Sequence, residues 1–134
     1  AVPSAGSIDC APKTGASTSR HGLFPLVAGA RVAALAWRIA APGTDARLAG
    51  AAAKAGLAAD MADDLAAARA VLVEAILDQQ IADIAEGRPP SNHVELRRLG
   101  RRGAHRLAKA LRTVTTISDF VQRTLSNRRP EQAA

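Results

Sequence analysis

Apolar residues recur every three or four positions along most of this chain, which is the spacing of one face of an α-helix. The longest such stretch begins near Leu57 and stops at Gly87, where Pro89 and Pro90 prevent the helix from continuing. The short connections between helical stretches favour an antiparallel helical bundle and an all-α fold. The pattern predicts four helices, at residues 26–40, 45–55, 58–86 and 100–127.

The segments outside these helices show neither a helical nor a strand period. Residues 1–22 combine Pro, Gly, Ser and Thr, and we expect an irregular lead-in or linker there. Residues 7–10 are the one short stretch within it that could be a strand fragment. Residues 23–127 then form the helical domain, and we expect residues 128–134 to be a frayed tail.

The helix predicted at residues 58–86 has two apolar faces. Its first face comprises Met61, Leu65, Ala68, Leu72, Ala75 and Gln79. Its second face comprises Val73, Leu77, Ile81 and Ile84. A helix with two apolar faces is expected to contact neighbours on two sides.

Composition supports helices over strands, because 48% of the residues are hydrophobic, many of them alanine, and only 2% are aromatic. Alanine is the strongest helix former and allows helices to approach closely. Cys10 is the only cysteine, so no intramolecular disulfide can form, and we expect a cytoplasmic protein. We also expect no signal peptide and no membrane span, because the most apolar stretch is interrupted by Arg31.

The net charge of +6 is unevenly distributed. Residues 57–86 hold seven acids and one arginine, whereas residues 88–112 hold eight bases and one acid. We expect these two segments to lie side by side, which would balance their charges. The basic run could instead hold phosphates of a nucleotide or nucleic acid, although the scarcity of aromatic residues argues against nucleic acid. The candidate phosphate contacts are Arg97, Arg98, Arg101 and Arg102, with Arg106 following in the same run.

No complete catalytic motif is present. Nucleotidyl transfer requires a Gly-Ser segment followed by closely spaced carboxylates that bind Mg²⁺, but the Gly-Ser pair at residues 6 and 7 is followed only by Asp9. The helix dipole explains three carboxylates at the start of a helix, Asp60, Asp63 and Asp64. The histidines lie singly, without zinc spacing, at His21, His93 and His105. We therefore expect no catalytic residue, no metal site and no cofactor in this chain.

Four segments of the chain resemble the nucleotidyltransferase substrate-binding domain family of bacteria. They are HGLFPLVAGARVAAL, TDARL, LDQQIADIAEGRPPSNHV and AKALRTVTTISDFVQRTL, in that order, within residues 21–127. In that family the helical domain follows a nucleotidyltransferase domain, often with cyclic-nucleotide-binding and cystathionine-β-synthase-type domains upstream. The assembly is similar to PII uridylyltransferases.

The resemblance implies a non-catalytic accessory domain that packs on the catalytic domain of the same polypeptide and helps to form its substrate cleft. Mg²⁺ and a nucleoside triphosphate would then belong to that catalytic domain. Where the family commonly has an Arg and a His before its glutamine, this chain has Ala75, Ile76 and Asp78. The matching positions are Arg31, Gln80, Gly87, Pro90 and Asn92.

Polar residues near the end of the long helix are the candidate substrate-binding site. Such groups are either hydrogen-bonded within the bundle or line a cleft. We expect an Asx-type turn at Asn92. We expect Arg31 to pair with a carboxylate or a backbone carbonyl of the bundle, because it is the only charge within its apolar segment. The candidates are Arg31, Gln79, Gln80, Asp83 and Asn92.

A second function also fits the pattern. The chain could be a free-standing interaction or dimerisation module in which the long helix packs against another copy. A homodimer is therefore an expected partner alongside a nucleotidyltransferase domain.

Overall fold

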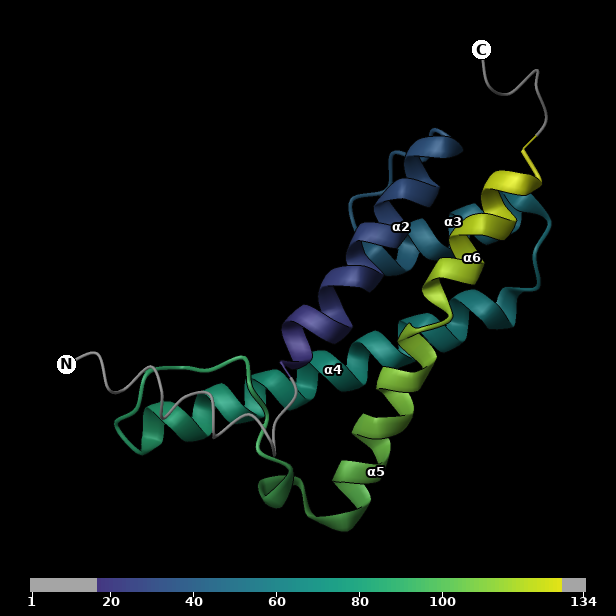
Figure 1. Ribbon diagram of the computed structural model, residues 1–134. Coiled ribbons are helices and arrows are strands. Elements are labelled where there is room, and N and C mark those ends of the chain that lie inside the picture. Colours follow the sequence, from purple (N-terminus) through teal and green to yellow (C-terminus); the bar gives the residue numbers. More distant parts are fainter. Residues whose placement is uncertain (1–16, 129–134) are drawn as a thin grey trace.

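The computed structural model describes residues 17–128, and helices make up its architecture (Figure 1). A π-helical turn, η2 (Ser19–Leu23), precedes α2 (Phe24–Ala36), α3 (Thr44–Ala55), α4 (Ala59–Ala85), α5 (Leu96–Val114) and α6 (Ile117–Ser126). The only β-type pairing within the described residues is an isolated bridge between Ser17 and His93. The all-α helical bundle expected from the periodicity is confirmed. None of the described helices is long and apolar enough to span a bilayer.

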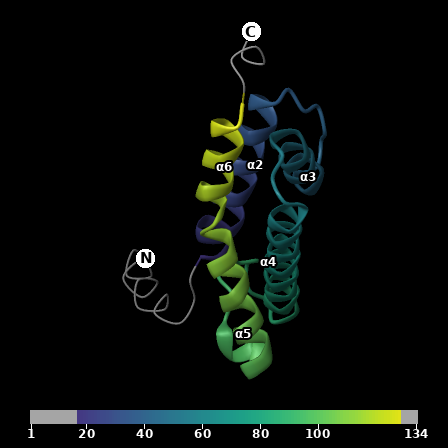
Figure 2. The ribbon, with the colours of Figure 1, turned by 90° about the vertical axis from the view of Figure 1, so that its right-hand side faces the viewer.

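The arrangement of the helices places α4 across the others. α2 and α6 pack side by side, α3 packs on α2 and α4, and α5 packs on α4. Figure 2 shows α6 continuing upward from α5, with α4 and α3 forming the neighbouring column. The last half of α4 extends beyond α2, and the end of this extension carries the candidate site.

The predicted helix at residues 100–127 is two helices in the structure. The chain turns at Thr115 and Thr116 between α5 and α6. The Thr115 hydroxyl donates to the Arg112 carbonyl at 2.6 Å, and the Thr116 hydroxyl donates to the Thr113 carbonyl at 2.6 Å. These side-chain bonds occupy carbonyls at the end of α5 and therefore compete with helix continuation.

The predicted irregular lead-in is also wrong for residues 19–22, because they belong to η2. Gly22 is buried there, and a Cβ atom at this position would lie 2.9 Å from Leu72 Cδ1 on α4. The absence of a side chain lets η2 approach α4 closely. The predicted strand fragment at residues 7–10 and the frayed tail beyond Arg128 lie outside the described residues.

The two apolar faces of α4 differ in how far they are buried. The first face is part of the core, where Leu65 and Leu72 are fully buried. On the second face Val73 is half-buried, but the rest is exposed, at 51% for Leu77, 65% for Ile81 and 63% for Ile84. The expectation that both faces contact neighbours is therefore wrong for these three residues within residues 17–128. We call Leu77, Ile81 and Ile84 the outer stripe.

The contact between α2 and α6 requires a glycine. Gly29 faces Ile117, and a Cβ atom at Gly29 would lie only 2.4 Å from Ile117 Cγ1. Nearby, Phe120 is fully buried, and Trp37 donates its indole N–H to the Thr124 carbonyl at 3.1 Å. The two helices are therefore held close by a small residue and one buried hydrogen bond.

We predict that Gly29→Ala lowers the free energy of unfolding by about 1–2 kcal/mol, because the added methyl group overpacks the contact with Ile117. In an Ile117→Ala background the same change should instead stabilise the protein by up to about 1 kcal/mol, through helix propensity. Urea denaturation of the four variants measures this coupling. An effect of the same sign in both backgrounds would contradict the proposed contact.

Candidate functional site

The chain leaves α4 through a complete helix stop. Gly87 has a φ of +73°, and its N–H donates to the Ile84 carbonyl at 3.0 Å. The Arg88 N–H donates to the Asp83 carbonyl at 2.8 Å, which completes a Schellman motif. Glycine suits the left-handed conformation, so the C-terminal position predicted for Gly87 is confirmed.

Two buried side chains of α4 then hold the segment that follows. Asp83 Oδ2 accepts the Ser91 N–H at 2.9 Å, and Gln79 Oε1 accepts the Glu95 N–H at 2.9 Å. Gln79 Nε2 also donates to Asp83 Oδ1 at 2.9 Å. Both residues are only 3% exposed, so these bonds satisfy polar groups that water cannot reach. We call Gln79, Asp83, Ser91 and Glu95 the clasp.

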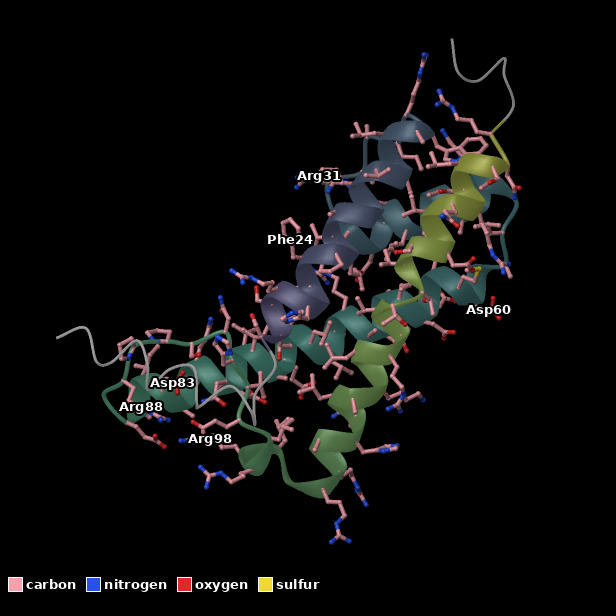
Figure 3. All side chains as sticks on the ribbon, viewed as in Figure 1. Phe24, Arg31, Asp60, Asp83, Arg88 and Arg98 are labelled. Carbon is pink, nitrogen blue, oxygen red and sulfur yellow. The ribbon has the colours of Figure 1, made fainter. Side chains whose placement is uncertain are left out.

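Charged side chains surround the exposed edge of the clasp. Arg88 lies 3.2 Å from Asp83 and 2.7 Å from Glu86, while Arg98 pairs with Glu86 and, at 3.3 Å, with Glu95. The hydrogen bond from Arg98 lowers the pKa of Glu86 and raises the pKa of Arg98 itself. Figure 3 shows Asp83, Arg88 and Arg98 together at the end of α4 opposite Asp60.

A groove of about 1080 Å³ lies between this segment and the start of α2. The bridge between Ser17 and His93 joins the two walls. Gln80 Nε2 donates to Asn92 Oδ1 at 3.0 Å and so orients Asn92 at the groove. The lining includes Arg20, His21, Phe24, Pro90, Asn92 and His93.

The structure brings together four of the five predicted substrate-binding residues. Gln79 and Asp83 belong to the clasp, so their side chains are used internally. Gln80 and Asn92 bond to each other beside the groove. The expected Asx turn at Asn92 is wrong, because Asn92 Oδ1 accepts from Gln80 Nε2, and the side-chain turn lies one residue earlier, where the Ser91 hydroxyl accepts the His93 backbone N–H at 3.0 Å.

Arg31 lies apart from the other candidates, and its predicted pairing is wrong. Its side chain is exposed and makes no hydrogen bond or ion pair within residues 17–128. Figure 3 shows Arg31 and Phe24 projecting from the same side of α2. That side is opposite the buried face formed by Leu26, Ala30 and Ala33, so the side chain of Arg31 points away from the core of the bundle.

The sequence interpretation missed the groove residues Arg20, His21, Phe24 and His93. Nothing in the spacing of the sequence shows that residues 17 and 93 meet, so it does not bring His21 and His93 to the same groove. The available signal was the resemblance itself, because HGLFP and PPSNH supply most of the two walls.

The basic run of α5 is only partly balanced by α4. Arg98 is paired with carboxylates as described, and Arg106 lies 3.9 Å from Glu74. Arg97, Arg101 and Arg102 are exposed and make no ion pair within the described part of the chain. The predicted phosphate contacts at these three arginines stay predictions.

No group of three or more His, Cys, Asp or Glu side chains within residues 17–128 could hold a metal ion. The candidate site offers hydrogen-bond donors and an exposed aromatic ring, which are groups suited to binding.

A family model described as "Putative nucleotidyltransferase substrate binding domain" matches residues 19–125. The match runs from η2 to α6 and includes the clasp and the described lining of the groove apart from Ser17. No curated protein and no solved structure matches the chain.

We predict that Asp83→Ala lowers the free energy of unfolding by about 2–4 kcal/mol, because it leaves the Ser91 N–H and the Gln79 amide without their buried acceptor. The ion pair between Arg88 and Asp83 contributes little to this loss because Arg88 is half exposed. Asp78→Ala is the matched control, since Asp78 is exposed on the same helix. Equal losses for the two variants in urea denaturation would contradict the clasp.

The lowered pKa of Glu86 predicts a pH dependence. A carboxyl with a lowered pKa in the folded state adds stability above its ordinary value, near 4.5, and loses it as the pH falls through the folded value. The stability difference between the unmodified chain and Glu86→Gln should therefore be full near neutral pH and vanish in acid.

Arg98→Gln tests the cause of that pH dependence. Denaturation midpoints measured from neutral pH down to pH 3 should show a smaller effect of Glu86→Gln in the Arg98→Gln background. An undiminished effect would mean that Arg98 does not lower the pKa of Glu86.

Proposed function

The chain belongs to this family of nucleotidyltransferase substrate-binding domains, and on that premise we propose that it is an accessory domain that completes the substrate cleft of a nucleotidyltransferase. In this proposal it packs on a catalytic domain of the same bacterial, cytoplasmic polypeptide. The catalytic domain binds Mg²⁺ and a nucleoside triphosphate and transfers a nucleotidyl or uridylyl group to a protein or a small acceptor.

The outer stripe of α4 is the observation that carries the proposal. Leu77, Ile81 and Ile84 repeat at intervals of four and three, so they lie on one face of the helix. All three are more than half exposed, although the opposite face of α4 is core. Fully covering a side chain of this size contributes about 1.5–3 kcal/mol, so the stripe favours association with a partner.

The groove lies near the same end of α4 as the outer stripe. Gln80 comes three residues after Leu77 and four before Ile84, and its amide bonds to Asn92 on the groove wall. A catalytic domain seated on the outer stripe would therefore lie next to the groove. This supports Gln80 and Asn92 as substrate contacts. We propose Arg97, Arg101 and Arg102 as further phosphate contacts because they are exposed and make no ion pair within residues 17–128.

A dimerisation module is the second candidate function. The outer stripe could also pack against the same stripe of a second copy, which would bury the same side chains. Sedimentation separates the two functions, because the accessory domain is expected to be a monomer by itself. A tight dimer that dissociates on Ile81→Ser would favour the module.

We predict that the reading frame upstream of Ala1 encodes a Gly-Ser segment followed by Asp-x-Asp, and that the domain so encoded binds this chain in trans. Ile81→Ser combined with Ile84→Ser should weaken that binding at least about tenfold, because apolar burial is lost. Calorimetric titration measures both affinities.

Leu125→Ser is the matched control, because Leu125 is an exposed apolar residue on α6, away from the outer stripe. It should leave the affinity unchanged. A reading frame without the motif, or equal effects of the stripe variant and the control, would overturn the proposed function.

A further inference from the structure

Phe24 is 71% exposed and lines the groove. The chain has only three aromatic residues, and the other two, Trp37 and Phe120, are buried in the core. Pro89 and Pro90 line the same groove from the segment that follows α4. The groove therefore offers a flat apolar surface that a planar ring can stack on.

The charged and titratable groups of the groove favour an anion. The Arg20 guanidinium and the His93 ring make no hydrogen bond or ion pair within residues 17–128, and no acidic side chain is found among the described lining residues. His21 Nδ1 lies 3.2 Å from the Ser17 carbonyl, so the His21 ring is held by the chain itself and is left out of the anion-binding set.

The uncharged polar groups of the groove are left mainly as donors. Asn92 Oδ1 already accepts from Gln80, so the two N–H groups of its amide are left over. The Ser91 hydroxyl accepts the backbone N–H of His93 at 3.0 Å, and the Ser17 hydroxyl accepts the backbone N–H of Arg20 at 3.3 Å. Both hydroxyls keep a hydrogen to donate. Phosphate oxygens, which only accept, match this set.

We propose that the groove binds a nucleoside phosphate, with its base stacked on Phe24 and its phosphate held by Arg20, His93 and the Asn92 amide. The groove volume of about 1080 Å³ is ample for such a ligand, since small-molecule sites measure about 300–1,000 Å³. The requirement for an anion attached to a flat ring rests on the groove alone. The choice of a nucleobase as that ring rests on the proposed function.

The test is a calorimetric titration of the full 134-residue chain, at low salt and without divalent metal. The probes are adenosine and uridine 5′-monophosphate, the two nucleosides, and ribose 5-phosphate. The monophosphates should bind at least about tenfold more tightly than the nucleosides or the sugar phosphate, because only they carry both ring and phosphate. Absence of binding by both monophosphates at millimolar concentration would overturn the proposal.

Two variants assign the two halves of the ligand. Phe24→Ala should weaken monophosphate binding by about 5- to 150-fold, the range for loss of one stacked base. Arg20→Gln should weaken it by about tenfold and leave nucleoside binding unchanged, because a charge-assisted contact to phosphate is lost. Both residues are at the surface, so thermal unfolding should be unaffected.

Matched controls lie outside the groove. Leu35→Ala removes another exposed apolar side chain of α2, and Arg112→Gln removes an exposed arginine of α5. Neither should change the affinity for the monophosphates. Binding that ignores Phe24→Ala and Arg20→Gln, or that responds equally to the controls, would place the ligand elsewhere and overturn the proposal.

The outcomes separate this inference from the proposed function. Monophosphate binding by the chain without association of the catalytic domain would support the groove and overturn the accessory role. The opposite outcome is that the catalytic domain associates, that the outer-stripe variant abolishes this association, and that no monophosphate binds. It would support the accessory role and overturn the groove as a nucleoside phosphate site.

Discussion

The hydrogen bonds that Asp83 and Gln79 make to the backbone N–H groups of Ser91 and Glu95 determine where the chain runs after α4. Both acceptors are buried, so moving this segment would leave them unpaired at a cost of about 1–3 kcal/mol each. The observed placement of the segment satisfies both. One wall of the groove, with Asn92 on it, is therefore fixed by two polar side chains of α4.

The other wall is tied to the same helix by packing. Gly22 lets η2 approach Leu72 of α4, since any side chain there would meet the leucine. The bridge between Ser17 and His93 then joins the walls directly. Because both walls are positioned against α4, the groove is held together although its residues are far apart in sequence.

The sequence predicted the helices well because their period reports which side of each helix is apolar. It could not reveal the break between α5 and α6, since Val114, Ile117 and Val121 keep the helical spacing across the turn. The pairing of Arg31 failed for a related reason. α2 is apolar on nearly all sides, so the pattern does not show which side faces the core. The groove itself depends on a contact between distant segments, which no local pattern contains.

One side of α4 is buried and another is exposed, and Gln80 lies between these two sides. The buried side carries Leu72 and the clasp, while the outer stripe is exposed. Gln80 flanks the stripe, yet its amide holds Asn92 at the groove. A partner that covers the stripe would exclude water from this hydrogen bond, and a hydrogen bond is electrostatically stronger in a drier environment. Docking on α4 would thereby steady the groove wall, which gives the two surfaces a physical connection through one side chain.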